Sequence, residues 1–258
     1  CHRNSNHLHW PYKGYYMKRS SLIIAAVVTM AIVLGTSGCV MGQTIALNAD
    51  NSGIAATDLV VDEFFIAVLE DFQAFEPERK DQTIMDASVE SFNKGMAAKQ
   101  SVSQVKSAKL GPTSYVVSFS FSDLNRFMLE MNEMKSQSLL NVTAAGNRTT
   151  FSISLNMQTY PQLTKLIPFL ADPNFETFGP LYNEGMSEAD YLDMISYILG
   201  EEGPPAITQS TIILLLEVPR PIISVNGGTL LGTRTARLEI PLIDFLLLAK
   251  PIEFNVTW

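Results

Sequence analysis

The chain has 258 residues, of which 47% are hydrophobic and 17% charged, a composition typical of a globular protein with a sizeable core. Its formal net charge is −8, and the first 38 residues hold four of the 18 lysines and arginines but none of the 26 acids, so the remainder carries −12. Nucleic acids bind through Lys and Arg side chains that neutralise phosphates, so this acidic remainder argues against a nucleic-acid partner.

Histidine and cysteine are confined to the start of the chain. All three histidines lie within the first ten residues, and the cysteines are Cys1 and Cys39. If the segment before Cys39 is removed, the remainder has no histidine and no second cysteine. Ser-His-Asp and Cys-His catalysis, an internal disulfide, and zinc, copper or haem sites built on His and Cys are then excluded. We therefore expect no metal and no cofactor.

The first segment has the pattern of an export signal. Residues 1–16 contain no methionine and no apolar periodicity, and we interpret them as an over-extended gene start. From Met17, two basic residues precede an uncharged apolar run over residues 22–34. A run of 13 residues is shorter than the about 20 needed to span a bilayer, so residues 17–38 are predicted to be a cleaved signal peptide. The alternative is an uncleaved signal anchor.

The end of this segment resembles the lipobox of bacterial lipoproteins, in which small residues precede a cysteine that receives a diacylglycerol. Ser37, Gly38 and Cys39 match that pattern, whereas Thr36 stands where leucine is most usual, as in the looser lipoboxes of spirochaetes. The resemblance implies cleavage between Gly38 and Cys39 and lipid, including palmitate, on Cys39. It also implies export and anchoring to a bacterial membrane, the outer membrane where the organism has two.

A polar tether after the cysteine is missing. Val40, Met41 and Gly42 stand between Cys39 and Gln43, and the first strand-like run follows at residues 44–48. Four extended residues reach about 13 Å. We expect the domain to sit close to the membrane, with a face toward it that is not strongly negative.

The segments that follow alternate between strand and helix patterns. Alternating or apolar runs separated by turn residues predict two hairpins early in the chain and a third around Gly146. Helical spacing of apolar residues predicts helices after Asp62, over residues 82–99 and after Asp123. The predicted strands of this half cover residues 44–48, 54–60, 102–110, 115–121, 138–145 and 149–157.

The second half opens with a Pro-rich, aromatic insertion at about residues 160–205, which contains a helix capped by Ser187. Strand-like runs follow over residues 208–218, 221–225, 233–240 and 252–258. Residues 212–216 are apolar on both faces and predict a central, buried strand. The fold class expected is α+β, with a mostly antiparallel sheet packed against several helices in one mature domain over residues 39–258. A division into two domains near Pro161 is the alternative.

The layout also resembles LppM-type bacterial lipoproteins, an α+β family of the cell envelope. The resemblance covers residues 39–157 and 208–258 and lies in the opening hairpin, the helix after it and the closing strands. It implies an envelope role and supplies no catalytic residues.

Aromatic residues of the insertion are candidates for the wall of an apolar binding cleft. They are Phe169, Phe175, Phe178 and Tyr182. Packing in the core is the alternative for each of them.

Paired carboxylates would suit a glycosidase, which needs neither histidine nor cysteine. Glu217, Glu239 and Asp244 interrupt apolar runs, and arginines at 220, 234 or 237 could pair with a buried acid. The alternative is that strand alternation places Glu217 and Glu239 on a solvent-facing side.

We expect a membrane-anchored envelope lipoprotein without enzymatic activity that binds an apolar ligand, a lipid or an envelope protein. Two alternatives remain open: a carboxylate-dependent hydrolase of envelope glycans, and a structural or assembly component of the envelope.

Overall fold

The computed structural model describes residues 40–61, 63–73, 83–132, 137–167, 170 and 173–258. These residues belong to one compact unit that runs from Ser37 to Trp258. The predicted start extension, the signal peptide and Cys39 lie outside the described residues. Among the described residues, no helix is both long and apolar enough to cross a membrane.

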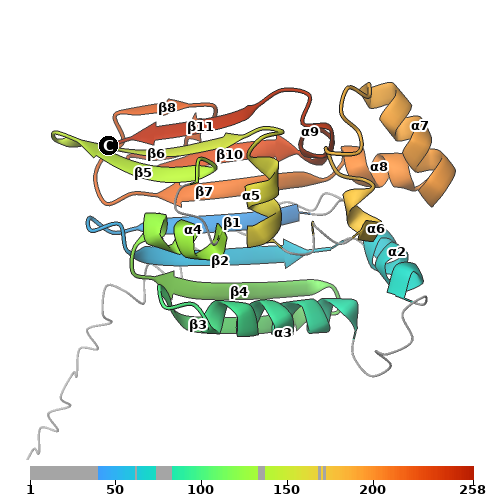
Figure 1. The fold of residues 1–258 in the computed structure, drawn as a ribbon, viewed down its shortest axis with the longest axis horizontal. Coiled ribbons are helices and arrows are strands. Elements are labelled where there is room, and N and C mark those ends of the chain that lie inside the picture. The colour runs from blue at the N-terminus through green and yellow to red at the C-terminus, as the bar shows by residue number, and fades with distance from the viewer. Residues whose placement is uncertain (1–39, 62, 74–82, 133–136, 168–169, 171–172) are drawn as a thin grey trace, which may run out of the picture. The chain divides into compact units, whose positions relative to one another are not determined.

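The larger of two sheets has seven strands in the order β3-β4-β2-β1-β7-β10-β9 (Figure 1). Neighbouring strands are antiparallel except β1 and β7, which pair in parallel. The strands are β1 (Val40–Leu47), β2 (Gly53–Val60), β3 (Val102–Gly111), β4 (Ser114–Phe121), β7 (Thr211–Glu217), β9 (Thr229–Leu230) and β10 (Thr235–Pro241).

The smaller sheet has four antiparallel strands in the order β5-β6-β11-β8. They are β5 (Leu140–Ala145), β6 (Arg148–Leu155), β8 (Ser224–Asn226) and β11 (Ile252–Thr257). The predicted α+β class with mostly antiparallel strands is confirmed. Alternation of apolar and polar residues along the chain does not reveal that the strands are divided between two sheets.

Helices occupy the predicted helical segments and much of the Pro-rich insertion. Thr83 and Ser187 cap α3 and α7, each accepting the backbone N–H three residues later on its hydroxyl at 3.2 Å. The described helices are α2 (Glu63–Gln73), α3 (Ile84–Ala97), α4 (Leu124–Asn132), α5 (Tyr160–Leu166), α6 (Pro173–Glu176), α7 (Glu188–Leu199), α8 (Gly203–Thr208) and α9 (Leu242–Leu247).

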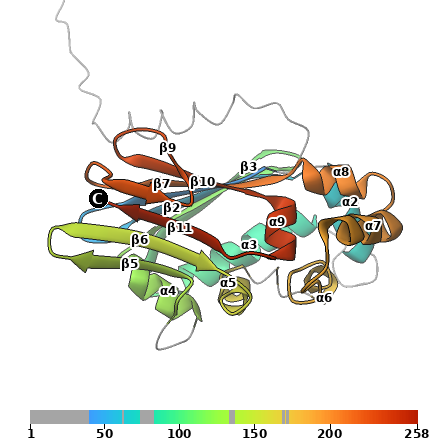
Figure 2. The same ribbon diagram turned by 90° about the horizontal axis from the view of Figure 1, so that it is seen from above.

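The main core lies between one face of the seven-stranded sheet and the layer formed by α3, α4 and the four-stranded sheet (Figure 2). Phe119 of β4 contacts Phe92 of α3 and Phe127 of α4, with ring centroids 6.3 and 5.3 Å apart. In the smaller sheet Phe151 and Phe254 pack edge to face at 6.2 Å. The buried rings of the helices and of the smaller sheet thus belong to the same core cluster.

The apolar run at residues 212–216 forms the central strand that the sequence predicts. It belongs to β7, between β1 and β10. Its Leu214 and Leu216 are buried in the core, whereas Ile213 and Leu215 are half-buried, so the burial predicted for both faces is found on one. The parallel neighbour, β1, begins at Val40, earlier than the strand predicted at residues 44–48. The expected three-residue spacer after Cys39 is thus part of the sheet, because its backbone pairs with both β2 and β7.

The two ends of the larger sheet differ. Helices α2, α6, α7 and α8 gather at the end where β1 begins, whereas the β1–β2 turn and the end of β11 lie at the opposite end (Figure 1).

Candidate ligand-binding cleft

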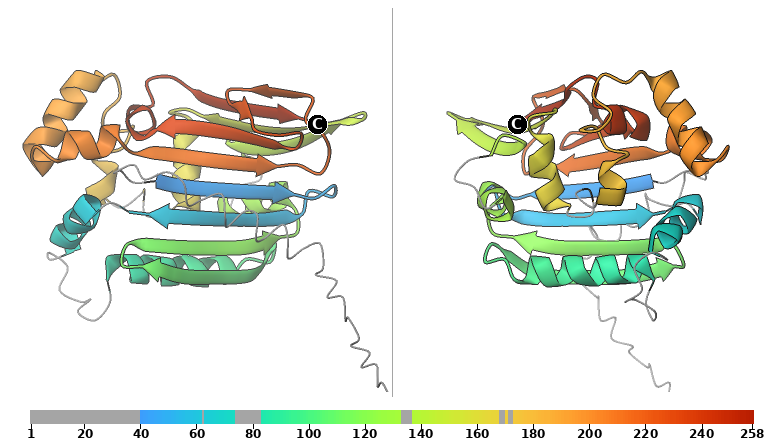
Figure 3. Two further views of the ribbon diagram at one scale, coloured as in Figure 1. Left: turned by 180° about the vertical axis from the view of Figure 1, so that it is seen from behind. Right: turned by 45° about the vertical axis from the view of Figure 1, so that its right-hand side comes forward.

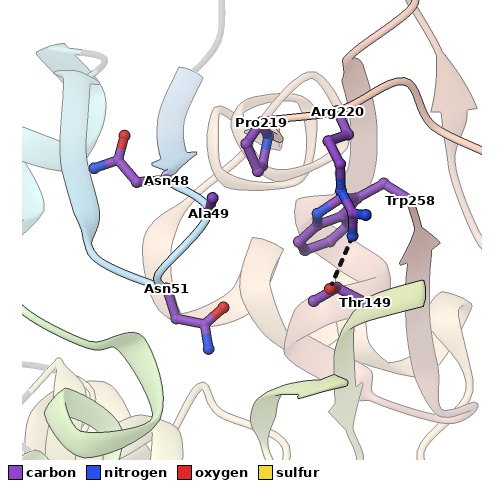
Figure 4. A pocket seen from close by; sticks show the side chains of 7 residues that line it. All are labelled: Asn48, Ala49, Asn51, Thr149, Pro219, Arg220 and Trp258. Atoms are coloured by element: carbon purple, nitrogen blue, oxygen red, sulfur yellow. Dashed lines mark hydrogen bonds between the residues drawn. The ribbon is translucent and has the colours of Figure 1, made fainter. Parts of the chain in front are cut away.

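A cleft of about 330 Å³ lies at the end of the sheets opposite to Val40. Its walls come from the β1–β2 turn, the start of β6, the segment after β7 and the residue after β11 (Figure 4). The lining residues are Asn48, Ala49, Asn51, Thr149, Pro219, Arg220 and Trp258. A volume near the lower bound for ligand pockets suits a small molecule.

The β1–β2 turn contributes two asparagines to the lining of the cleft, but the Asn48 side chain points away from Arg220 and donates to the Ser52 hydroxyl at 2.9 Å (Figure 4). The backbone N–H of Asn48 donates to the carbonyl of Ser52 at 2.8 Å, and Asn51 has a left-handed φ of 64°, which Asn tolerates well. Asp50 accepts hydrogen bonds from the hydroxyl and backbone N–H of Ser52, at 2.6 and 3.1 Å, and these bonds lower the pKa of its carboxyl. These hydrogen bonds within the turn fix its conformation and so set the positions of Asn48 and Asn51.

Arg220 supplies the positive charge of the cleft. Its guanidinium donates to the carbonyl of Asn147 at 3.2 Å and to Oγ1 of Thr149 at 3.3 Å (Figure 4). Within the described part of the chain no carboxylate forms an ion pair with it. Because neutral oxygens hold the guanidinium, its charge remains available to an anion.

Trp258 forms the floor of the cleft. Its backbone exchanges two hydrogen bonds of 2.9 Å with Thr149, and its side chain is packed in the main core at 3% exposure. A ring buried in this way closes the bottom of the cleft beside the guanidinium and leaves little apolar surface for a ligand.

The arrangement favours recognition of a small molecule with an anionic group. The guanidinium of Arg220 and the carboxamide of Asn51 are groups that donate to carboxylate or phosphate oxygens. The described lining includes no Asp or Glu, so this cleft gives no support to a carboxylate-based hydrolase.

Three of the four predicted cleft-lining aromatics are described, and they lie in or between α6 and α7, at the end opposite to this cleft. Phe175 is half-buried against the cluster of Val61, Met85 and Tyr115. Phe178 packs against a different cluster, and its carbonyl accepts a hydrogen bond from the Tyr191 hydroxyl at 2.9 Å. Tyr182 is 66% exposed, and Phe169 lies outside the described residues. The structure therefore does not bring Phe175, Phe178 and Tyr182 together in one wall.

The candidate acids are also separate from the cleft. Glu239 is exposed and forms a 2.8 Å ion pair with Arg237, and Glu217 is half-buried on the same side of the sheet. The interpretation of Glu239 as solvent-facing is confirmed. Asp244 is exposed in the first turn of α9. Among the described residues there is no group of three or more Asp, Glu, His or Cys side chains that could hold a metal.

Comparisons with known proteins find little. No family model and no curated protein matches the chain. Among solved structures, the NMR structure of the folded domain of the Mycobacterium tuberculosis LppM protein is similar, with a TM-score of 0.37 and 9% sequence identity. The match covers 87% of this chain and 92% of that one.

Proposed function

We propose that the chain is a membrane-anchored lipoprotein of the cell envelope that binds a small anionic molecule in the Arg220 cleft without transforming it. The observation that carries this proposal is the guanidinium of Arg220. It faces a cleft of about 330 Å³ beside the indole of Trp258, and the hydrogen bonds that hold it come from Asn147 and Thr149 rather than from a carboxylate. A carboxylate or a phosphate ester is the ligand class that this chemistry recognises.

The anchor is supported by the order of segments at the start of the chain. An uncharged apolar run and small residues precede Cys39, and β1 begins at the next residue. Acyl chains on Cys39 would hold the beginning of β1 at the membrane surface. The cleft lies at the other end of this strand, where it stays accessible to molecules in the surrounding compartment.

The anchor is tested by metabolic labelling. Bacteria that express the parent chain are expected to incorporate an alkyne-bearing palmitate analogue into the protein, and the Cys39→Ala variant is expected to lose this label. Met41→Ala is the matched control, because it changes a residue close to Cys39 and leaves the cysteine in place. Labelling that survives Cys39→Ala would show that the lipid is attached elsewhere, and a parent chain without label would show that no lipid is attached.

The cleft is tested by ligand titration followed by NMR. Glucuronate and glucose 6-phosphate are the anionic probes, and glucose is the neutral comparison. We expect the anions to bind more tightly than glucose. Arg220→Ala is expected to weaken anion binding by about 10-fold to 100-fold, since a hydrogen bond to a charged group contributes about 1.5–3 kcal/mol.

Arg126→Ala is the matched control, because it removes an equal charge from an exposed position on α4. Its anion affinity should equal that of the parent. Equal losses in the two variants would mean that net charge, rather than the cleft, governs binding. Binding of glucose as tight as that of glucuronate would contradict the assigned role of Arg220.

A further inference from the structure

One face of the seven-stranded sheet has no described helix or strand against it. Strand register places Ala46, Ile54, Ala56 and Val60 on this side, opposite to the core residues Ile45 and Ala55. We call it the open face; it also includes Gly42, Thr44, Asp58, Val116, Ile213, Leu215, Glu217, Arg237 and Glu239. Figure 3, left, shows β7, β1, β2 and β4 unobstructed from this side, and Figure 2 shows α3, α4 and α5 on the other.

The open face carries apolar side chains beside polar ones, among them Ser118 and Ser120 of β4. A sheet that is solvated on one side normally alternates apolar inward residues with polar outward ones. Here the outward positions at the middle of the sheet include Ile54 and Val60, at 51% and 46% exposure, together with Ile213 and Leu215. Exposed apolar side chains on a face that no described element covers suit contact with a partner or a membrane.

The position of the anchor indicates that a membrane, rather than a protein partner, covers the open face. Val40 directly follows Cys39, starts the fourth strand of seven and pairs with Val60. One residue spans less than about 4 Å, so acyl chains on Cys39 would enter the bilayer beside the open face.

The distribution of charge agrees with a lipid surface. The open face carries Asp58 and Glu217, while its Glu239 is paired with Arg237. Residues 181–202, by contrast, contain six acids and no lysine or arginine. Anionic lipid headgroups would repel that segment far more strongly than the open face.

We propose that the open face lies on the lipid surface next to the anchored Cys39; this inference depends on the anchoring proposed above. Ile54, Val60, Ile213 and Leu215 then contact the interfacial region of the bilayer. A second copy of the chain is the competing occupant, because two apolar sheet faces can also pack on each other.

Asp58 provides a sensitive probe of this contact. It lies on the open face between Gly42 of β1 and Val116 of β4, and burial in the sheet raises the pKa of its carboxyl. Contact with lipid would desolvate this carboxylate further. Replacing it by a neutral isostere should therefore strengthen the contact.

The first experiment measures the depth of single labels in the full, lipidated chain. Ile54→Cys, Val60→Cys and Ile223→Cys, whose introduced cysteine is the free thiol of the cleaved and lipidated chain, are labelled with a nitrobenzoxadiazole fluorophore and reconstituted into phosphatidylcholine/phosphatidylglycerol vesicles. Ile223 is the matched control, being 58% exposed next to the four-stranded sheet. Nitroxide-bearing lipids should quench the labels at positions 54 and 60 severalfold more than the label at 223. Equal quenching at the three positions would overturn the proposal.

The second experiment varies the charge of the open face. Asp58→Asn should increase quenching of the label at position 60. Asp193→Asn, which removes the same charge from an exposed site on α7, should leave it unchanged. An increase of equal size in both variants would assign the effect to net charge and contradict the contact.

Two controls separate failure of the docking from failure of the anchor. If the protein no longer floats with vesicles after Cys39→Ala and the parent does, the anchor stands, and the quenching pattern alone decides the docking. If the parent does not float, the anchor fails first. Labels at positions 54 and 60 that are already shielded in a detergent-solubilised dimer would assign the open face to a second copy and overturn the lipid proposal.

Discussion

Replacing Gly227 by alanine is expected to lower the free energy of unfolding by about 3 kcal/mol or more. Gly227 lies between β8 and β9 with a φ of 78°, a conformation that disfavours residues with a Cβ atom. An added Cβ would overlap the carbonyl oxygen of Glu253 and lie 2.8 Å from its carbonyl carbon. The neighbouring backbone of β11 would have to move, and urea unfolding followed by circular dichroism measures the cost.

Gly146→Ala provides a matched control for this prediction. Gly146 also has a positive φ, 60°, but its added Cβ would meet no atom within 4 Å. The control should therefore show the backbone cost alone, about 1–2 kcal/mol. Equal losses in the two variants would mean that the contact with Glu253 is not a constraint on the fold.

Phe254→Ala is the second substitution with a large expected effect. Phe254 is fully buried in β11, stacks edge to face on Phe151 and packs so closely on Gly228 that a Cβ there would lie 2.6 Å from its ring. Truncation leaves a cavity and should cost about 3–5 kcal/mol of unfolding free energy. Tyr197→Ala, at a ring that is 92% exposed on α7, should change it by less than about 0.5 kcal/mol. A small loss at Phe254 would show that the two sheets repack around it.

Local signals predicted most of the secondary structure. The turn at Gly146 and Asn147 separates β5 from β6, and Thr83 and Ser187 begin helices through the capping chemistry of their hydroxyls. These signals act over a few residues, so they are readable in sequence. Helix α9 was missed, because Ile243, Phe245 and Leu247 are all buried in a six-residue element too short to show a helical period.

The candidate cleft could not be predicted in the same way. Asn48, Thr149, Arg220 and Trp258 come from four separated segments, and the pairing of strands between the two sheets brings them together. Arg220 was considered as the partner of an acid, yet its neighbours are the oxygens of Asn147 and Thr149. Composition shows that the chain after Cys39 lacks histidine and a second cysteine. The position of the Arg220 guanidinium depends on tertiary contacts, which composition does not encode.

The parallel pairing of β1 with β7 also governs the order in which the domain can fold. Val40 pairs with Thr211, and β6 pairs with β11. Neither sheet can therefore be completed before β7 and β11 have been synthesised. As the chain emerges from its amino terminus, β1 and β6 each present an unpaired, aggregation-prone edge until those late strands arrive. We therefore expect chaperones to bind the domain during its synthesis and to be released once β7 and β11 have paired.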